Sequence, residues 1–479
     1  MDAGDGGSKA EPGAAPAGAR PEERRSAVVV AGAAAIGGFL FGYDTAVING
    51  AVDAIEAEFR LSPLVLGAAV SSALIGGALG AWFAGPLADR IGRVGVMRIA
   101  AVLFAVSSVG AALAVGPVSL TAWRVVGGLA VGAASVIAPA YIAEVAPAEQ
   151  RGRLGSLQQL AIVSGIFVAL VVDYALATLA GGAGAQEPWG GAAWRWMFAS
   201  AAVPAVVYGV VALRIPESPR YLVRRKRYDE ARAVLSKYVG DGVRVGEIDR
   251  SLAGGGRGTR LSQLRGDPAG RRLGLLPIVW VGMVLGALQQ LVGINVVFYY
   301  STTLWRAVGF EERDALITSV ITSGTNIVAT LVAIALVDRV GRKPLLTVGA
   351  GGMVLTLAVL AWCFSRATGS GENVSLPPTV GVIALVTANL YVVSFAASWG
   401  PVLWVLLGEM FNNRIRAAAI AVAGTVQWTA NWLVTVSFPA IAEVGLTLAY
   451  GVYTAFAVLA LVFVARAVPE TKGRELETM

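Results

Sequence analysis

The chain has 479 residues, of which 56% are hydrophobic and 14% charged, and its mean hydropathy is +0.68. Soluble domains carry about a quarter charged residues, so this composition excludes an ordinary soluble domain. The net charge of +7 does not indicate a nucleic-acid partner, because the basic residues lie in loops between apolar segments. With a single cysteine, Cys363, and no histidine, we expect no disulfide framework and no metal site.

Twelve mostly apolar segments follow a first stretch, residues 1–25, that is rich in Gly, Ala, Pro and charge and is expected to form a disordered tail. Each segment is long enough to cross the hydrocarbon core of a bilayer as a helix. The first is too long for the core of a signal peptide and is interpreted as a true span. The twelve lie at about 27–50, 64–88, 95–116, 119–143, 154–178, 194–213, 275–304, 314–337, 344–365, 380–408, 415–438 and 446–466.

The longest stretch without an apolar segment, residues 214–272, holds 15 Lys/Arg and 7 Asp/Glu. Several short loops on the same side of the expected membrane are also basic, which identifies that side as cytoplasmic. An even number of spans, twelve, then places both termini on the cytoplasmic side of the plasma membrane. We therefore expect the following organisation: a cytoplasmic tail at 1–25, a six-helix bundle at 26–213, a cytoplasmic linker at 214–272, a second six-helix bundle at 273–466 and a cytoplasmic tail at 467–479.

Charged motifs occur twice, at the ends of corresponding segments in the two halves, at offsets of 249, 265 and 253 residues. Any one motif could simply anchor a helix end, but three matched motifs predict a duplicated six-helix unit whose halves rock around a midplane site. Ion pairs among these residues are predicted to form a cytoplasmic gate that breaks on opening. The gate residues are Asp89, Arg93, Glu144, Arg151 and Glu217 in the first half, and Asp338, Arg342, Glu409, Arg416 and Glu470 in the second.

No energy-converting or catalytic motif is present in the sequence. A phosphate-binding loop ends in Gly-Lys, and the chain contains no Gly-Lys dipeptide. Transport would therefore be passive or driven by an ion gradient. Without histidine, paired catalytic carboxylates or a nucleotide motif, we expect no catalytic residue, no enzyme activity and no cofactor.

Four motifs together resemble the sugar porter family of the major facilitator superfamily, over about residues 37–475. They are Asp89-Arg-Ile-Gly-Arg93, Pro216-Glu-Ser-Pro-Arg220, Gln289-Gln-Leu-Val-Gly-Ile-Asn295 and Pro469-Glu-Thr-Lys-Gly473. Within that family the chain is most similar to bacterial proton-coupled glucose and xylose permeases. The resemblance implies an all-α membrane fold of twelve helices in two pseudo-symmetric bundles, with short intracellular helices in the linker.

Amide and aromatic side chains gather in the fifth, seventh, tenth and eleventh segments. Carboxamides donate and accept hydrogen bonds as sugar hydroxyls do, and aromatic faces cover the apolar face of a pyranose. An isolated amide in a span is more often a helix contact, which we expect for Gln158. The resemblance assigns sugar binding to Gln159, Gln289, Gln290, Asn295, Asn326, Trp404 and Gln427, a gate or contact role to Phe41 and Tyr299, and a nearby aromatic position to Trp428.

Two backbone features of these segments favour a distorted helix. Gly293 would allow the seventh segment to break or unwind, so that Gln290 and Asn295 share one face. Gly400-Pro401 in the tenth segment predicts a kink or hinge, because proline removes a backbone donor.

Asp44 lies deep in the first segment, where a carboxylate needs a partner or a proton. Arg124 in the fourth segment is the expected partner. The resemblance supports proton coupling through this pair, since proton-coupled members carry an acid at the position of Asp44 and many uniporters an amide. A static structural pair is the alternative. Asp173, near the outer end of the fifth segment, is a second and weaker candidate.

These observations predict a proton-coupled monosaccharide symporter that imports D-glucose by alternating access and functions as a monomer in the lipid bilayer. A proton-independent facilitator stays open, as does a symporter for xylose, another hexose or a polyol, because amides recognise the hydroxyl pattern that all of these share. A sugar sensor of the same fold would usually carry long cytoplasmic extensions, whereas the tails here are about 25 and 13 residues.

Overall fold

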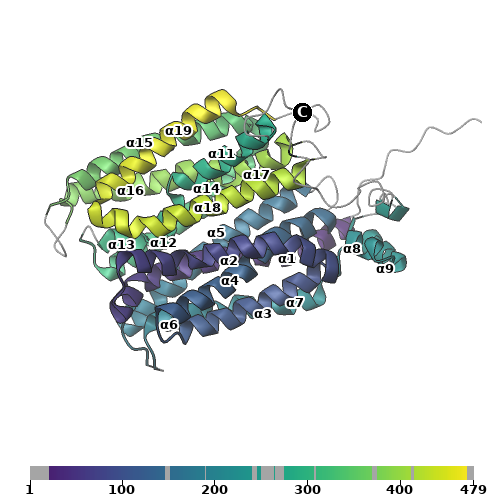
Figure 1. Cartoon of the computed structure of the whole chain (residues 1–479), viewed down its shortest axis with the longest axis horizontal. Coiled ribbons are helices and arrows are strands. Elements are labelled where there is room, and N and C mark those ends of the chain that lie inside the picture. The colour runs from purple at the N-terminus through teal and green to yellow at the C-terminus, as the bar shows by residue number, and fades with distance from the viewer. Residues whose placement is uncertain are drawn as a thin grey trace, which may run out of the picture.

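The computed structural model describes residues 21–145, 151–188, 190–239, 245–246, 248–249, 264, 275–306, 309–368, 375–411 and 415–471. The regular elements in that part of the chain are helices, which confirms the all-α fold. Figure 1 shows them in two bundles that lie side by side, α1–α7 in one and α11–α19 in the other. The short helices α8 and α9 lie together at one end of the molecule (Figure 1).

The first bundle contains the six expected spans, the last of them broken into two helices. Its first helix begins at Pro21, inside the stretch expected to be a disordered tail. Proline is favoured at the first helical position. The helices are α1 (Pro21–Phe59), α2 (Pro63–Ile91), α3 (Arg93–Ala112), α4 (Pro117–Val145), α5 (Arg151–Ala180), α6 (Ala193–Ser200) and α7 (Ala202–Arg214).

The linker holds the short helices that the sequence predicted. They are α8 (Pro219–Arg224), α9 (Tyr228–Val234) and a π-helical turn, η2 (Leu235–Val239). Ser218 caps α8, because its hydroxyl accepts a hydrogen bond from the backbone N–H of Tyr221 at 3.4 Å. Most of residues 240–274 lie outside the described part of the chain.

The second bundle repeats the first with more breaks. Its helices are α11 (Pro277–Leu291), α12 (Ile294–Tyr299), α13 (Ser301–Arg306), α14 (Glu312–Val340), α15 (Arg342–Ser365), α16 (Pro378–Ala396), α17 (Trp399–Met410), α18 (Arg416–Val444) and α19 (Leu446–Ala467). Among the described residues, eleven of the twelve expected spans are long and apolar enough to cross a membrane. The twelfth, α18, is long enough but less apolar, because it carries Gln427 and Asn431.

Small residues allow the helices inside each bundle to approach closely. A Cβ atom placed on Gly76 of α2 would lie 2.1 Å from the carbonyl oxygen of Val125, and one on Gly128 of α4 would lie 2.1 Å from that of Ala73. Backbones in such contact are typical of helices packed in a membrane. Large apolar side chains, by contrast, face outward: Val102, Leu213 and Leu355 are each more than 60% exposed, as a lipid-facing surface requires.

The two bundles meet mainly along two pairs of helices, α2 with α18 and α5 with α14, and α1 also contacts α12 and α13. The repeat relates these pairs, since α2 and α14 are the second spans of their halves and α5 and α18 the fifth. At one end of the molecule lie the basic motifs and the linker helices, which we call the basic end. The opposite end, where the chain carries Asp53, Glu58, Glu312 and Glu443, is called the acidic end.

Candidate functional site

The seventh span breaks at Gly293, as the sequence predicted. Gly293 has φ of 83°, in the left-handed region, and a Cβ atom there would lie 2.7 Å from the ring of Tyr453. The break frees a backbone carbonyl at Val292, which accepts a hydrogen bond from the hydroxyl of Tyr391 at 2.8 Å. Backbone groups freed inside a membrane must be satisfied by protein, and this tyrosine does so.

Four amides from α11, α12 and α18 form one hydrogen-bonded cluster at the break. Gln289 donates to the backbone carbonyl of Trp399 at 2.7 Å, and its own side-chain oxygen accepts from Gln290 at 3.2 Å and from Gln427. Asn295 in turn donates to the side-chain oxygen of Gln290. We call Gln289, Gln290, Asn295 and Gln427 the amide cluster. Each bond in the cluster is one that a sugar hydroxyl could replace, so binding would exchange hydrogen bonds and not create unpaired groups.

Aromatic side chains lie at the boundary between the bundles. The rings of Phe41 on α1 and Trp428 on α18 are 5.5 Å apart, and Trp428 also packs on Gly77 of α2, where an added Cβ would lie 2.8 Å from its ring. Trp404 on α17 is 43% exposed, and its ring edge lies 4.0 Å from the Cβ position of Gly424 on α18. These aromatic faces are suited to covering the apolar face of a pyranose.

The remaining predicted sugar residues lie on other helices. The side-chain nitrogen of Gln159, on α5, is 3.9 Å from the Cβ position of Gly400 and so faces α17 of the other bundle. Asn326 is buried on α14 and Tyr299 ends α12. Within the described part of the chain, no hydrogen bond joins Asn326 to the amide cluster. Gln158 packs on Gly38 of α1, the helix contact expected for it.

The tenth span also breaks, close to the predicted hinge. Helix α16 ends at Ala396 and α17 begins at Trp399, which leaves Pro401 in the first turn of α17. A proline ring clashes with the carbonyl four residues earlier, here that of Ala397, so the break falls upstream of the proline itself. The carbonyl of Trp399, at this new helix start, is the one that holds Gln289.

Asp44 and Arg124 form the predicted ion pair, with 3.0 Å between the carboxylate and the guanidinium. Arg124 is 3% exposed and also donates to the backbone carbonyls of Asp44 and Val70, each at 3.3 Å. The guanidinium therefore joins α4 to α1 and α2. Beside the pair lies a cavity of about 10 Å³, with Ser107 and Phe198 also in its wall. This volume is near the minimum that one water molecule needs.

At the basic end of the first bundle, two glutamates hold the start of α3. Glu217 accepts hydrogen bonds from the backbone N–H groups of Arg93 at 2.9 Å and Val94 at 3.2 Å, where an acid complements the helix dipole. Glu144 binds the Arg93 guanidinium at 3.0 Å. Asp89 pairs with Arg224 of α8 at 2.6 Å and lies 3.6 Å from Arg93.

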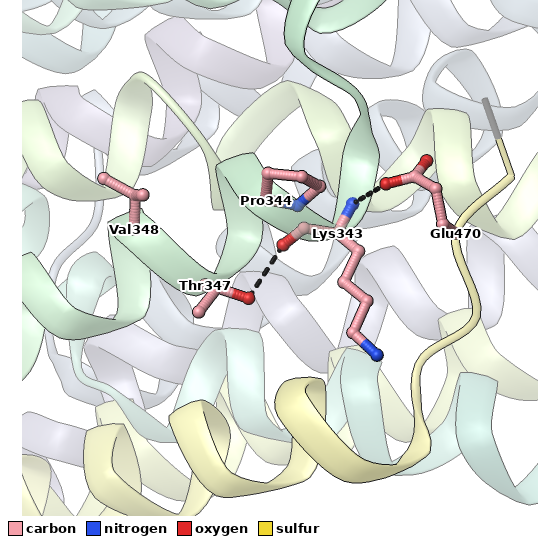
Figure 2. A pocket seen from close by; sticks show the side chains of 5 residues that line it. All are labelled: Lys343, Pro344, Thr347, Val348 and Glu470. Atoms are coloured by element: carbon pink, nitrogen blue, oxygen red, sulfur yellow. Dashed lines mark hydrogen bonds between the residues drawn. The ribbon is translucent and has the colours of Figure 1, made fainter.

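The second bundle repeats the contacts of both glutamates. Glu470 accepts from the backbone N–H groups of Arg342 at 3.1 Å and Lys343 at 2.9 Å, and Glu409 binds the Arg342 guanidinium at 2.7 Å. Figure 2 shows the Glu470 carboxylate against the start of α15 and the hydroxyl of Thr347 bonded to the Lys343 carbonyl. A shallow hollow of about 500 Å³ lies there, at the molecular surface and lined by none of the predicted sugar residues.

None of these basic-end bonds between described residues joins the two bundles, and the Asp89–Arg224 pair joins the first bundle to the linker. The side chains of Arg151, Asp338 and Arg416 fall outside the described part of the structure. The clusters that are described therefore fasten helix ends of a single half to one another. Their action as a gate between the halves stays a prediction.

The acidic end carries contacts that the sequence did not reveal. The side-chain oxygen of Asn49 on α1 accepts from the backbone N–H of Thr302 at 2.9 Å, and Asp53 binds Thr303 and Arg306 of α13, each at 2.6 Å. We call this set, which joins α1 to α13, the acidic-end clamp. The residues of Asn49–Thr302 and of Asp53–Arg306 are each 253 positions apart, which is close to the offsets of the repeated motifs. The opposite charges of Asp53 and Arg306 at that spacing were the one hint of this contact in the sequence.

A second link reinforces the clamp between α5 and α14. Glu312, at the start of α14, accepts from the backbone N–H of Ala183, just after α5, at 2.7 Å. The guanidinium of Arg313 is hydrogen-bonded to Tyr174 of α5. These bonds also cross between the two bundles, so the structure is closed at its acidic end.

Comparisons with known proteins agree with this geometry. The profile of the family described as "Sugar (and other) transporter" matches residues 30–479. A glucose transport protein of Synechocystis sp. is 55% identical over 457 residues, 94% of this chain and 96% of its own length. The D-xylose-proton symporter of Escherichia coli is 36% identical over 484 residues, 93% of each chain.

The fold has been solved before in a similar protein. The structure described as a partially occluded inward open conformation of the xylose transporter XylE from E. coli has a TM-score of 0.79 and 35% sequence identity, and the match covers 94% of this chain and 100% of that one. A match of this extent includes both bundles. The chain therefore belongs to the sugar transporter family.

Proposed function

We propose that this chain is a proton-coupled monosaccharide symporter that imports D-glucose by alternating access. The observation that carries the proposal is the buried Asp44–Arg124 pair, 3.0 Å apart, in a transporter whose other half holds the amide cluster. The name of the 55% identical relative gives glucose as its substrate, and the name of the E. coli relative describes it as a proton symporter.

The amide cluster and the boundary aromatics supply the sugar site. Amides match hydroxyl groups that both donate and accept, and no charged side chain is needed for a neutral ligand. Gln159 would complete the site from the opposite half, since it faces α17 across the boundary. A sugar held by both halves favours their closing around it.

Protonation of Asp44 would act through Arg124. A neutral carboxyl holds the guanidinium less strongly, so Arg124 would rely on its bonds to the backbone carbonyls of Asp44 and Val70. Val70 belongs to α2, which packs on α18 of the other half. A shift of Arg124 therefore reaches the boundary that must move in alternating access.

Orientation follows from charge. The basic end faces the cytoplasm and the acidic end the outside of the plasma membrane, which puts both termini inside. With the acidic-end clamp formed, this conformation is closed to the outside. The basic-end residues, including Arg151 and Arg416, would form the opposing gate when the protein faces outward, and one chain contains both halves of the site, so a monomer suffices.

The proton gradient is strong enough for accumulation. One elementary charge crossing 100 mV is worth about 2.3 kcal/mol. Since about 1.4 kcal/mol is a factor of ten, this sustains roughly 50-fold accumulation of sugar.

The test is uptake of radiolabelled D-glucose into proteoliposomes, with and without an inward proton gradient. Wild type should accumulate glucose above equilibrium only with the gradient. Asp44→Asn should exchange glucose without accumulating it. Asp229→Asn is the control, because this acid is exposed on α9 and pairs only with a neighbour on the same helix, Arg232.

The outcomes separate the alternatives. Wild type that merely equilibrates glucose, with or without the gradient, would show a facilitator in which Asp44 is structural. Movement of xylose or a polyol in place of glucose would change the substrate and leave the coupling intact. Accumulation by Asp44→Asn equal to wild type would exclude this residue as the proton site.

A further inference from the structure

A second carboxyl is buried in the first bundle, away from the Asp44–Arg124 pair. Asp173, on α5 near the acidic end, has no exposed surface. One of its oxygens accepts a long hydrogen bond, 3.3 Å, from the backbone N–H of Gly50 on α1. Its other oxygen, Oδ1, is buried and has no hydrogen-bond partner in the described structure.

No cation compensates this carboxyl. None of the Lys or Arg side chains in the described part of the chain lies within ion-pair distance of Asp173. Three cations on the helices packed against α5 have partners elsewhere: Arg124 on α4 holds Asp44, Arg195 on α6 holds Glu58 and Arg313 on α14 holds Tyr174. The other charged groups of these helices near the acidic end are acids, which cannot compensate a carboxylate: Asp53, Glu56 and Glu58 on α1, and Glu312 and Asp314 on α14. The titratable group that interacts with Asp173 from α1 is Tyr43, which is neutral and bonded to Ser200.

An ionised carboxylate is not stable in such a place. Charges buried without a partner are strongly disfavoured, and the group takes up a proton instead. A protonated carboxyl has no charge, and its second oxygen still accepts from the Gly50 N–H. Its O–H group is a donor without a partner among the described residues, which costs less than an unpaired charge. Close packing keeps water out, because a Cβ atom on Gly50 would lie 2.7 Å from that of Asp173.

The position of Asp173 links it to the acidic-end clamp. Its contact on α1, Gly50, follows Asn49, which binds Thr302 of the other half. Its neighbour on α5, Tyr174, binds Arg313 of the other half. Asp173 thus lies next to residues of two of the connections that close the acidic end, Asn49–Thr302 and Tyr174–Arg313.

We propose that Asp173 is a second proton-binding site, occupied by a proton on its carboxyl while the acidic-end clamp is closed. One proton binds the Oδ1 oxygen, and no other bond forms or breaks. When the clamp opens, α1 and α5 lose their contacts with α13 and α14 of the other half. Water then reaches the carboxyl, and the proton leaves to the outside. The site therefore favours closure at low external pH, and this preference is lost as the pH rises.

Infrared spectroscopy tests the occupancy without requiring transport. A protonated carboxylic acid has a carbonyl stretching band that a carboxylate lacks. Wild type in lipid at neutral pH should show this band, and Asp173→Asn should lose it while Asp229→Asn keeps it. If the Asn variant does not fold, ¹³C-aspartate labelling of the Asp44→Asn protein should shift the band. A spectrum with no band sensitive to either change would overturn the proposal.

Sugar counterflow tests the link to the clamp, in a background where Asp44 cannot titrate. Glucose exchange by Asp44→Asn should fall by about threefold or more between about pH 6 and about pH 8, as the deprotonated Asp173 disfavours closure. Exchange by Asp44→Asn/Asp173→Asn should be independent of pH. A pH-dependent double variant, or a pH-independent single one, would overturn the link.

This inference can fail separately from the proposed function. If Asp44→Asn abolishes accumulation but the infrared band is absent, symport stands and the second site falls. If glucose is not transported at all, the band and its loss in Asp173→Asn still decide whether the carboxyl holds a proton.

Discussion

The two halves share one fold but divide the chemistry between them. In the first half, α1 runs unbroken and carries a charge, Asp44, held by Arg124. In the second half the equivalent span breaks at Gly293 and carries neutral Asn295, 251 residues after Asp44. Gly42 is the equivalent of Gly293, yet it stays helical and packs so closely on α5 that an added Cβ would lie 1.9 Å from the Ile162 carbonyl oxygen. One repeat thus holds the proposed proton site in an unbroken helix, and the other holds the proposed sugar site in a broken one.

The largest effect on stability is expected from removing the charged partner of Asp44 in the first half. Arg124→Leu leaves Asp44 buried without its partner, which costs about 3–5 kcal/mol. The double variant with Asp44→Asn should recover much of that loss. Thermal unfolding in detergent measures both. Arg232→Leu, which removes an exposed pair on α9, is the control and should change stability by about 0.5 kcal/mol or less. Equal losses in the two arginine variants would contradict the structural role of the buried pair.

The break in the second half gives the next effect. Gly293→Ala forces an alanine to φ of 83° and places its Cβ against the Tyr453 ring. The backbone strain alone costs about 1–2 kcal/mol, and displacement of Asn295 should lower glucose uptake as well. Gly351→Ala on α15, with no atom within 4 Å of the added Cβ, should instead be neutral or stabilising. Full activity and stability in Gly293→Ala would show that the break is not required.

Substitutions in the amide cluster should lower the affinity for glucose without abolishing proton-driven accumulation. Gln290→Leu removes one amide and the acceptor of Asn295, so glucose affinity should fall about tenfold, equivalent to roughly 1.4 kcal/mol. The ratio of sugar accumulated with and without the proton gradient should stay above one. Gln158→Leu is the matched control: it removes a buried amide that packs on α1, and its effect should be on stability. An unchanged affinity in Gln290→Leu would remove this residue from the site.

The smallest effect on stability is expected at the glutamates that hold a helix start in each half. Glu217→Gln and Glu470→Gln each remove the charge that holds the start of a helix, α3 or α15, and each should cost about 1 kcal/mol. Because the bonds repeat, the two melting temperatures should fall by similar amounts. A marked difference would mean that one cluster also bridges the halves.

Much of this arrangement could be read from the sequence. Hydropathy located most spans to within a few residues, although α1 continues nine residues past its predicted end, to Phe59, and α18 six residues past, to Val444. The paired motifs predicted the repeat, and it is seen at Gly92 and Gly341, which both end a helix with positive φ beside a glutamate. The break at Gly293 and the Asp44–Arg124 pair followed from residue type and position. In these cases one residue imposes a constraint that few environments satisfy.

The acidic-end clamp and the isolation of Asp173 could not be read in the same way. Asn49, Thr302 and Arg306 are ordinary polar residues near helix ends, and their contact depends on how the halves are tilted. Which acid lacks a cation is likewise a property of packing, because it depends on where every neighbouring side chain already has its partner. The beginning of α1 at Pro21 was missed since the composition of the preceding residues concealed a local start signal.

The mutual bonding of the amide cluster has a consequence for the proposed sugar selectivity. Because Gln289, Gln290, Asn295 and Gln427 bond to one another, a ligand that binds here must replace those hydrogen bonds. A small molecule with only a few hydroxyls would free more amide groups than it could bond, and the unpaired groups would count against it. The hydrogen bonds within the amide cluster would therefore select ligands by their number of hydroxyl groups as well as by their stereochemistry.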